Sequence, residues 1–351
     1  MGLTDGPTMN TRSISFTIAV LAVALSWHAA WAQPEPAAER LQVVATVGMI
    51  ADVAREVGGS CVDVEFLMGP GSDPHLFRAS AGDINKLRRA QLILFGGLGL
   101  EGQLGEVLAG LSRSIPTLAV SEAAVPEGQR LGSLAGYAYD PHVWLDAGQW
   151  ADAALVIGEA LAGAPGIAEQ CAAAIGERAA AYHALLNDLD DWALRSLSTI
   201  PEGQRVLVTA HDAFAYFGRA YGIEVVGVQG ISTETEAAVA DIRRVADLVV
   251  ERAVPAVFIE STINPRTLQA VIDGVIQRGG SVRLGAQLYA DSLGAQGRPE
   301  GTYVGMLVHD VAAITAELGG TVIGLPTSAA GWLATWYPDG DTDLYLAEAE
   351  E

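Results

Sequence analysis

From residue 41 onward, short apolar runs rich in β-branched residues alternate with longer stretches of helical periodicity. In the first half of the chain the runs predict strands at 41–47, 62–67, 92–95 and 117–120, with helices at 50–57, 80–90 and 101–111 between them. In the second half strands are predicted at 205–210, 223–228, 256–259 and 282–288, with helices at 213–221, 235–252, 265–277 and 303–318. Such a succession of strands and helices indicates mostly parallel sheets covered by helices.

One long segment, 167–199, separates the two series. It is rich in Ala, Leu, Glu and Arg, has no Pro, and contains Gly176 as its one glycine. This composition predicts a single helix of about 50 Å at 1.5 Å per residue. We therefore expect an α/β protein with two lobes, each a mostly parallel sheet flanked by helices, joined by one long rigid helix. Open α/β sheets bind ligands at the loops after their strands, which here face the cleft between the lobes.

The chain ends have patterns of their own. Arg12 precedes an apolar run at 14–27, and Ala30-Trp31-Ala32 matches the small-x-small cleavage pattern of a secretory signal peptide. We expect cleavage after residue 32 and export to the periplasm, and no membrane anchor, because the run is shorter than the roughly 20 residues that span a bilayer. The expected organisation is a signal peptide at 1–32, an N-terminal lobe at 33–166, the linking helix at 167–199, a C-terminal lobe at 200–336 and an acidic tail at 337–351.

Charge and cysteine content narrow the class of protein. The formal net charge is −22 and half of the residues are apolar, which is typical of a soluble exported protein. Such acidity disfavours nucleic acid or an anionic membrane as a partner. Cys61 and Cys171 fit either a disulfide, which an oxidising compartment permits, or two buried thiols.

Two of the six histidines, His75 and His142, stand in the same tripeptide, Asp-Pro-His. Proline fixes its own φ and restricts the residue before it, so each His is expected on a stiff loop. His211 and Asp291 follow predicted strands, so they also lie on loops. A lone loop His is usually solvated, and Asp291 before Ser292 resembles a helix N-cap. Four ligands closing on one metal ion nevertheless explain the repeated tripeptide better. The other three histidines, His28, His183 and His309, have ordinary settings in the signal peptide, the long helix and the last predicted helix.

A rival motif lies at 97–102, which reads Gly-Leu-Gly-Leu-Glu-Gly between a predicted strand and a predicted helix. The pattern matches a dinucleotide-binding fingerprint, with Glu122 at about the right distance to contact a ribose. It falls in the third βα unit rather than the first, and an exported protein has little access to NAD. We therefore favour a glycine-rich turn that lets the backbone pass close to the cleft.

These motifs resemble, in order, those of the periplasmic metal-binding proteins that serve zinc and manganese ABC importers, the cluster A-I substrate-binding family. The segments that carry the resemblance are 69–75 (GPGSDPH), 80–84 (SAGDI), 96–101 (GGLGLE), 140–146 (DPHVWLD), 211–217 (HDAFAYF), Glu260-Ser261 and 291–293 (DSL). By this similarity His75, His142, His211 and Asp291 are the four metal ligands. The resemblance implies capture of a divalent metal ion and its delivery to an inner-membrane permease, by a protein that is a monomer and not an enzyme. The chain departs from the family at Gly96, where Asn is usual.

The ligand types bear on which ion is bound. Three imidazoles and one carboxylate suit Zn²⁺ in a four-coordinate site, whereas Mn²⁺ prefers more oxygen. Manganese and iron members of the family commonly carry Glu at the position of His211, which favours zinc. Manganese stays open, and iron with it, because the loop 121–139 lacks the His-rich segment of many zinc members, and a bidentate Asp291 would raise the coordination number. Glu260 and Asp212 are candidate acceptors for the second ring nitrogen of a liganding His, and a helix N-cap role fits Asp212 at least as well.

Two other classes of protein fit part of the pattern. A secreted zinc hydrolase would need three protein ligands, an open position and a base, for which Glu260 is a candidate if Asp291 does not bind. A metallochaperone or adhesin would bind metal without a transporter. The importer interpretation predicts capture by small shifts of loops and lobes, because the long helix resists a wide hinge.

Overall fold

The computed structural model describes residues 1–2, 40–132 and 138–336. Most of the expected signal peptide and all of the acidic tail at 337–351 lie outside the described residues. The described residues from Arg40 onward form one compact unit that contains both sheets. In the described part of the chain, no helix is both long enough and apolar enough to cross a membrane.

The first sheet is parallel and has the strand order β2-β1-β3-β4. Its strands are β1 (Leu41–Ala45), β2 (Val62–Phe66), β3 (Leu92–Phe95) and β4 (Thr117–Ala119). The helices of this half are α2 (Gly48–Gly58), α3 (Ala81–Arg89), α4 (Leu104–Leu111) and α5 (Val120–Ala124). β1 is almost entirely buried and pairs on both sides, as its apolar sequence predicts for a central parallel strand.

The second sheet repeats this arrangement with the order β6-β5-β7-β8, again parallel. Its strands are β5 (Val206–His211), β6 (Glu224–Gln229), β7 (Ala256–Glu260) and β8 (Arg283–Leu288). The helices of this half are α8 (Ala215–Tyr221), α9 (Val239–Glu251), α10 (Arg266–Gln277), α11 (Tyr303–Glu317) and α12 (Thr327–Trp336). The expected α/β class, with two parallel sheets flanked by helices, is confirmed.

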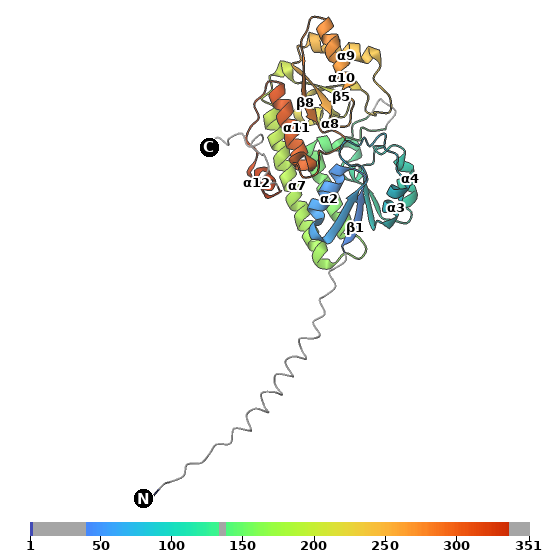
Figure 1. Ribbon diagram of the computed structural model, residues 1–351, viewed down its shortest axis with the longest axis vertical. Helices are drawn as coiled ribbons and strands as arrows, with labels where there is room; N and C mark the ends of the chain where they lie inside the picture. The colour runs from blue at the N-terminus through green and yellow to red at the C-terminus, as the bar shows by residue number, and fades with distance from the viewer. Residues whose placement is uncertain (3–39, 133–137, 337–351) are drawn as a thin grey trace. The chain divides into compact units, whose positions relative to one another are not determined.

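A single helix, α7 (Glu169–Leu197), joins the two halves over 29 residues. It runs past both sheets in Figure 1 and packs against α2, α11 and α6 (Ala147–Ala162). Its buried residues recur at intervals of three and four, the spacing of one helix face. The long joining helix predicted from composition is therefore confirmed. The described residues also form short 3₁₀ helices at Gly59–Cys61, Glu127–Gln129, Val143–Leu145, Glu202–Gln204 and Pro299–Gly301.

A disulfide between Cys61 and Cys171, with a Cα–Cα distance of 5.8 Å, ties the segment before β2 to the first turn of α7. Of the two alternatives for the cysteines, the disulfide is the one present. It lies before the N-terminal end of β2, whereas His75 follows the other end of that strand, and it closes a loop that contains β2, β3 and β4.

Candidate metal centre

The four candidate ligands converge from two loops of the first lobe and from one strand end and one loop of the second. The prediction that His211 lies on a loop is wrong, because β5 extends through it. His75 follows β2 and His142 precedes the 3₁₀ turn Val143–Leu145, whereas His211 ends β5 and Asp291 follows β8. Each offers one donor atom, and these donor atoms all lie within 4.8 Å of one another. None of the four residues is more than 2% exposed. Residues separated by more than 200 positions in the sequence thus form one buried cluster.

The spacing of the donor atoms fits a small cation at their centre. His142 Nε2 lies 3.2 Å from Oδ1 of Asp291, and His211 Nε2 lies 3.2 Å from its Oδ2. His75 Nε2 lies 3.2 Å from His142 Nε2 and 3.8 Å from Asp291 Oδ2. A tetrahedron with metal–ligand bonds of 2.0–2.1 Å has edges of about 3.4 Å. The observed separations lie on both sides of that value.

Hydrogen bonding leaves the centre of the cluster unsatisfied. His211 Nε2 and both carboxylate oxygens of Asp291 are buried without a hydrogen bond of acceptable geometry to any residue in the described ranges. Buried polar atoms of this kind are rare and costly unless something pairs with them. A divalent cation would satisfy all of them at once, so the donor set fits a metal ion.

The two Asp-Pro-His segments fold in the same way. Oδ1 of Asp73 accepts a hydrogen bond from the backbone N–H of His75 at 2.9 Å, and Oδ1 of Asp140 accepts one from the backbone N–H of His142, also at 2.9 Å. Each Asp therefore closes a tight turn with its own side chain, and the proline between fixes φ. This local structure presents the imidazole at the tip of a stiff loop, as the sequence predicted.

The second ring nitrogen of two histidines is held by a buried carboxylate. Nδ1 of His142 lies 2.7 Å from Asp140 Oδ1, and Nδ1 of His211 lies 3.1 Å from Glu260 Oε1. Such partners fix the tautomer, so that Nε2 carries the lone pair for a metal. The prediction for Glu260 is confirmed. Asp140 was missed, although a carboxylate two residues before a liganding His was the available signal. In the described part of the chain Asp212 neither accepts from a histidine ring nor caps α8, whose N-cap residue is Phe214.

Burial and neighbouring charges shift the pKa values of the cluster residues in different directions. Burial lowers the pKa of His75 to about 4. Burial also acts to lower the pKa of His142, but Asp140 and then Asp291 outweigh it and raise that pKa to about 9. Burial would raise the pKa of Asp291, yet the charge of His211 and the contact with His142 hold it well below its usual range. The carboxylate is therefore an anionic oxygen at neutral pH, as a cation site requires.

The glycine-rich segment after β3 is a turn and not a nucleotide cradle. Its backbone N–H groups are already used: those of Gly96 and Gly97 donate to the buried carboxylate of Glu101. The N–H of Leu98 donates to Glu122 at 3.0 Å. A phosphate needs these same donors, and Glu122, the candidate ribose contact, is bound to the turn. The dinucleotide interpretation is therefore wrong.

The same turn supports the His75 loop. Gly102 has φ of 47°, and a Cβ atom there would stand 2.7 Å from the backbone oxygen of His75. Only glycine permits both this conformation and this approach. The expectation that the turn lets backbone pass close to the cleft is confirmed at Gly102.

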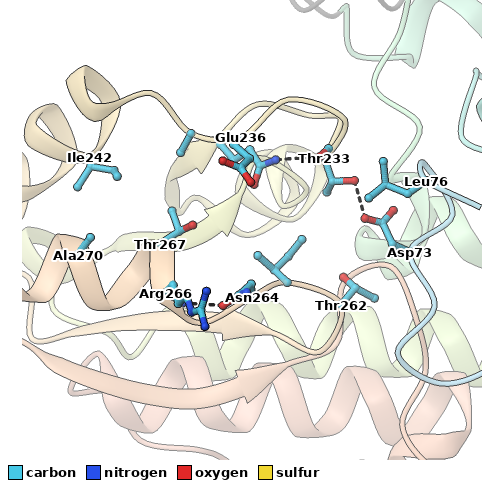
Figure 2. A pocket seen from close by; sticks show the side chains of 13 residues that line it. Asp73, Leu76, Thr233, Glu236, Ile242, Thr262, Asn264, Arg266, Thr267 and Ala270 are labelled. Atoms are coloured by element: carbon cyan, nitrogen blue, oxygen red, sulfur yellow. Dashed lines mark hydrogen bonds between the residues drawn. The ribbon is translucent and has the colours of Figure 1, made fainter.

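A pocket of about 560 Å³ opens beside the His75 loop, between that loop and the α9–α10 side of the second lobe. None of the four candidate ligands lines it, but Asp73 does. Figure 2 shows Oδ2 of Asp73 accepting a hydrogen bond from Thr233 Oγ1, at 2.5 Å, at the rim of the pocket. This bond connects the His75 loop to the segment between β6 and α9. The pocket is therefore a neighbour of the metal centre and not the centre itself.

Known proteins resemble this chain in sequence and in fold. Residues 43–317 match the family described as zinc-uptake complex component A, periplasmic (ZnuA). The manganese-binding lipoprotein MntA of Bacillus subtilis is 42% identical over 280 residues, which cover 80% of this chain and 90% of that protein. The zinc-binding protein TroA of Treponema pallidum is 44% identical over 277 residues, or 79% and 88% of the two chains. A solved structure of periplasmic TroA has a TM-score of 0.76 at 43% identity, covering 80% of this chain and 99% of that one.

Fold and site together define a two-lobed protein that binds a metal ion. The chain belongs to the ZnuA family of periplasmic metal-binding proteins, the substrate-binding components of metal ABC importers. Members of this family act in transport and are not enzymes. The resemblance seen in the sequence motifs is thereby confirmed.

Proposed function

We propose that this protein binds one divalent transition metal ion, zinc, through His75, His142, His211 and Asp291, and delivers it to an inner-membrane permease. The convergence of these four buried side chains on one point carries the proposal. Their order along the chain follows the family motifs, and each lobe contributes two of them. The metal ion is cargo in this account, so its release matters as much as its capture.

The preference for zinc rests on the donor set. Three imidazole nitrogens and one carboxylate form a borderline-soft, four-donor site that Zn²⁺ accepts readily. Mn²⁺ prefers additional oxygen donors, and position 211 holds His rather than Glu. The names of the two relatives point to different metals, manganese for MntA and zinc for TroA, so the argument depends on ligand chemistry. Both oxygens of Asp291 face imidazoles, which leaves manganese as the alternative cargo.

Burial of the ligands dictates how the ion enters and leaves. With every ligand at most 2% exposed, an ion reaches the centre only if at least one loop moves away. The joining helix α7 packs along both lobes and resists a wide hinge. We propose that the lobes, at 33–166 and 200–336, shift slightly to admit the ion, and that docking on the permease reopens the site. Residues 1–32 would direct the chain to the periplasm, where it acts as a monomer.

A secreted zinc hydrolase is the less favoured alternative. A catalytic zinc keeps an open position for water, whereas four protein donors surround the centre here. Glu260, the candidate base, already accepts from the backbone N–H groups of Ala210 and His211 and lies against the His211 ring. Its carboxylate oxygens are engaged in supporting a candidate ligand, so they do not point toward a substrate as a catalytic base would.

Metal analysis tests this function. Protein purified without chelator and then titrated with zinc and with manganese should bind one ion per chain and prefer zinc in direct competition. His142→Ala should lose most of the affinity, because an open hydrated position replaces one of four ligands. His183→Ala is the control, since His183 lies on α7 beside Asp152 and away from the cluster. Zinc binding that survives in His142→Ala would contradict the assignment.

A further inference from the structure

Trp144 connects His142 to the loop that carries Asp291. It stands two residues after His142, its ring lies 5.4 Å from the His142 ring, and it is 1% exposed. Its indole Nε1 donates a hydrogen bond of 2.7 Å to the backbone oxygen of Ala290, in the opposite lobe. The backbone oxygen of Trp144 in turn accepts from the hydroxyl of Tyr303, at 2.7 Å. One side chain thus fixes the position of the residue immediately before Asp291.

A second hydrogen bond holds the residue immediately after Asp291. The backbone N–H of Gly71, in the loop that carries His75, donates to Oγ of Ser292 at 3.0 Å. Ser292 is 4% exposed, and its Oγ lies 3.2 Å from that of Ser261 within its own lobe. Each histidine loop of the first lobe therefore forms one hydrogen bond to the Asp291 loop, one before Asp291 and one after it.

We infer that Trp144 and Ser292 are positioning residues, which hold Asp291 at ligand distance from the histidines of the opposite lobe. The inference rests on the ligand set proposed above. Within its own lobe the Asp291 loop is fixed at Tyr289, whose N–H donates to the buried Asp310 of α11. That contact orders the loop in the second lobe but does not relate it to the first. The two bonds from the first lobe fix the residues on both sides of Asp291 relative to the loops that carry His75 and His142.

Two substitutions remove one of these bonds each. Trp144→Phe keeps a buried aromatic ring but leaves the carbonyl of Ala290 without its donor. Ser292→Ala removes the acceptor of Gly71. Partners that orient ligands typically contribute 10- to 100-fold to metal affinity. We expect each variant to raise the Kd for zinc about 10-fold or more, measured by competition with a chromogenic chelator at a temperature well below the unfolding transition.

The chain offers a matched control for each substitution, at a site far from the metal ligands. Nε1 of Trp192 donates to the backbone oxygen of Ile323 at 2.8 Å, and the N–H of Ile323 donates to Oγ of Ser196 at 3.4 Å. Trp192 and Ser196 are as buried as their counterparts. Trp192→Phe and Ser196→Ala should therefore lower the melting temperature of the metal-free protein as the test variants do, but leave the Kd for zinc within about twofold of the parent value.

The outcomes separate positioning from ordinary structural support. If Trp144→Phe and Ser292→Ala lower only the melting temperature and bind zinc as the parent does, the inference is overturned. If Trp144→Phe does not fold, the pair Ser292→Ala and Ser196→Ala decides by the same criterion. Failure of the proposed function has a different signature, because the parent protein itself would then bind no zinc or His142→Ala would bind it unchanged.

Discussion

Asp140 holds His142 twice with a single carboxylate oxygen, which accepts from the backbone N–H at 2.9 Å and lies 2.7 Å from ring Nδ1. Asp73, in the matching tripeptide, accepts from the backbone N–H of His75 and uses its other oxygen to accept from Thr233. One repeated motif thus serves two purposes. In the first case it orients a ring, and in the second it ties a ligand loop to the opposite lobe.

This difference predicts unequal effects of the same substitution. Asp140→Asn preserves the size of the side chain but removes the charge that favours the Nδ1–H tautomer of His142. We expect the affinity for zinc to fall roughly 10-fold or more, as for other partners of metal-bound histidines. The affinity for zinc should fall less in Asp73→Asn, because Asp73 accepts hydrogen bonds from the backbone N–H of His75 and from Thr233. Isothermal titration with zinc measures both, and equal losses in the two variants would contradict the distinction.

Position 211 is predicted to set the choice of ion. His211→Glu replaces an imidazole with a hard anionic oxygen donor, which Mn²⁺ tolerates better than Zn²⁺ does. The ratio of zinc affinity to manganese affinity should fall, mainly through weaker zinc binding. Parallel titrations of parent and variant with the two ions give this ratio. A ratio that does not move would mean that residue 211 does not determine specificity.

Removal of the metal should lower thermal stability. An ion that binds only the native state contributes RT ln(1 + [L]/Kd), roughly 4 kcal/mol at a thousandfold excess over Kd. The melting temperature should therefore rise when zinc is added and return to its lower value with a chelator. The shift should shrink as pH falls, because His75, His142 and His211 must be neutral at Nε2 to bind metal. A scanning calorimeter detects the change, and no shift at saturating zinc would point to another ligand.

A buried carboxyl remote from the ligands predicts a pH dependence of folding. Burial raises the pKa of Asp52 from 3.8 to about 6, although its side chain accepts from the backbone N–H of Tyr303 at 2.8 Å. Because the folded pKa exceeds the unfolded one, its contribution is present below about pH 4 and is lost as pH rises through 6. Asp52→Asn keeps the acceptor and removes the titration. It should be more stable than the parent at pH 7 by about 3 kcal/mol, but not at pH 4, as measured by denaturant unfolding of the metal-free protein.

The sequence marked the four candidate ligands more clearly than the contacts that support them. His75, His142, His211 and Asp291 were recognisable because a rare tripeptide and the ends of strands mark them locally. The role of Asp140 depends on the rotamer of its side chain, and the hydrogen bond from Trp144 to Ala290 depends on how the two lobes are arranged. Neither feature leaves a periodic signal in the sequence.

The fold shows the same division between local and distant information. Strands such as β3 were predicted at their observed bounds because an apolar run between turns is a local signal. The helix α12, which lies beyond the last predicted helix, was not predicted, because its ten residues form only a weakly amphipathic stretch. The disulfide stayed open because Cys61 and Cys171 are 110 positions apart, and only their spatial distance decides whether they pair.

Anomalous diffraction from crystals of the zinc-loaded protein, recorded at the zinc absorption edge, tests the central claim most directly. The account predicts one strong peak per chain, about 2.0–2.2 Å from Nε2 of His75, His142 and His211 and from at least one oxygen of Asp291. The same crystals soaked with chelator should lose the peak. A peak bound to other residues, or no peak at stoichiometric zinc, would contradict the assignment of these four residues as the metal centre.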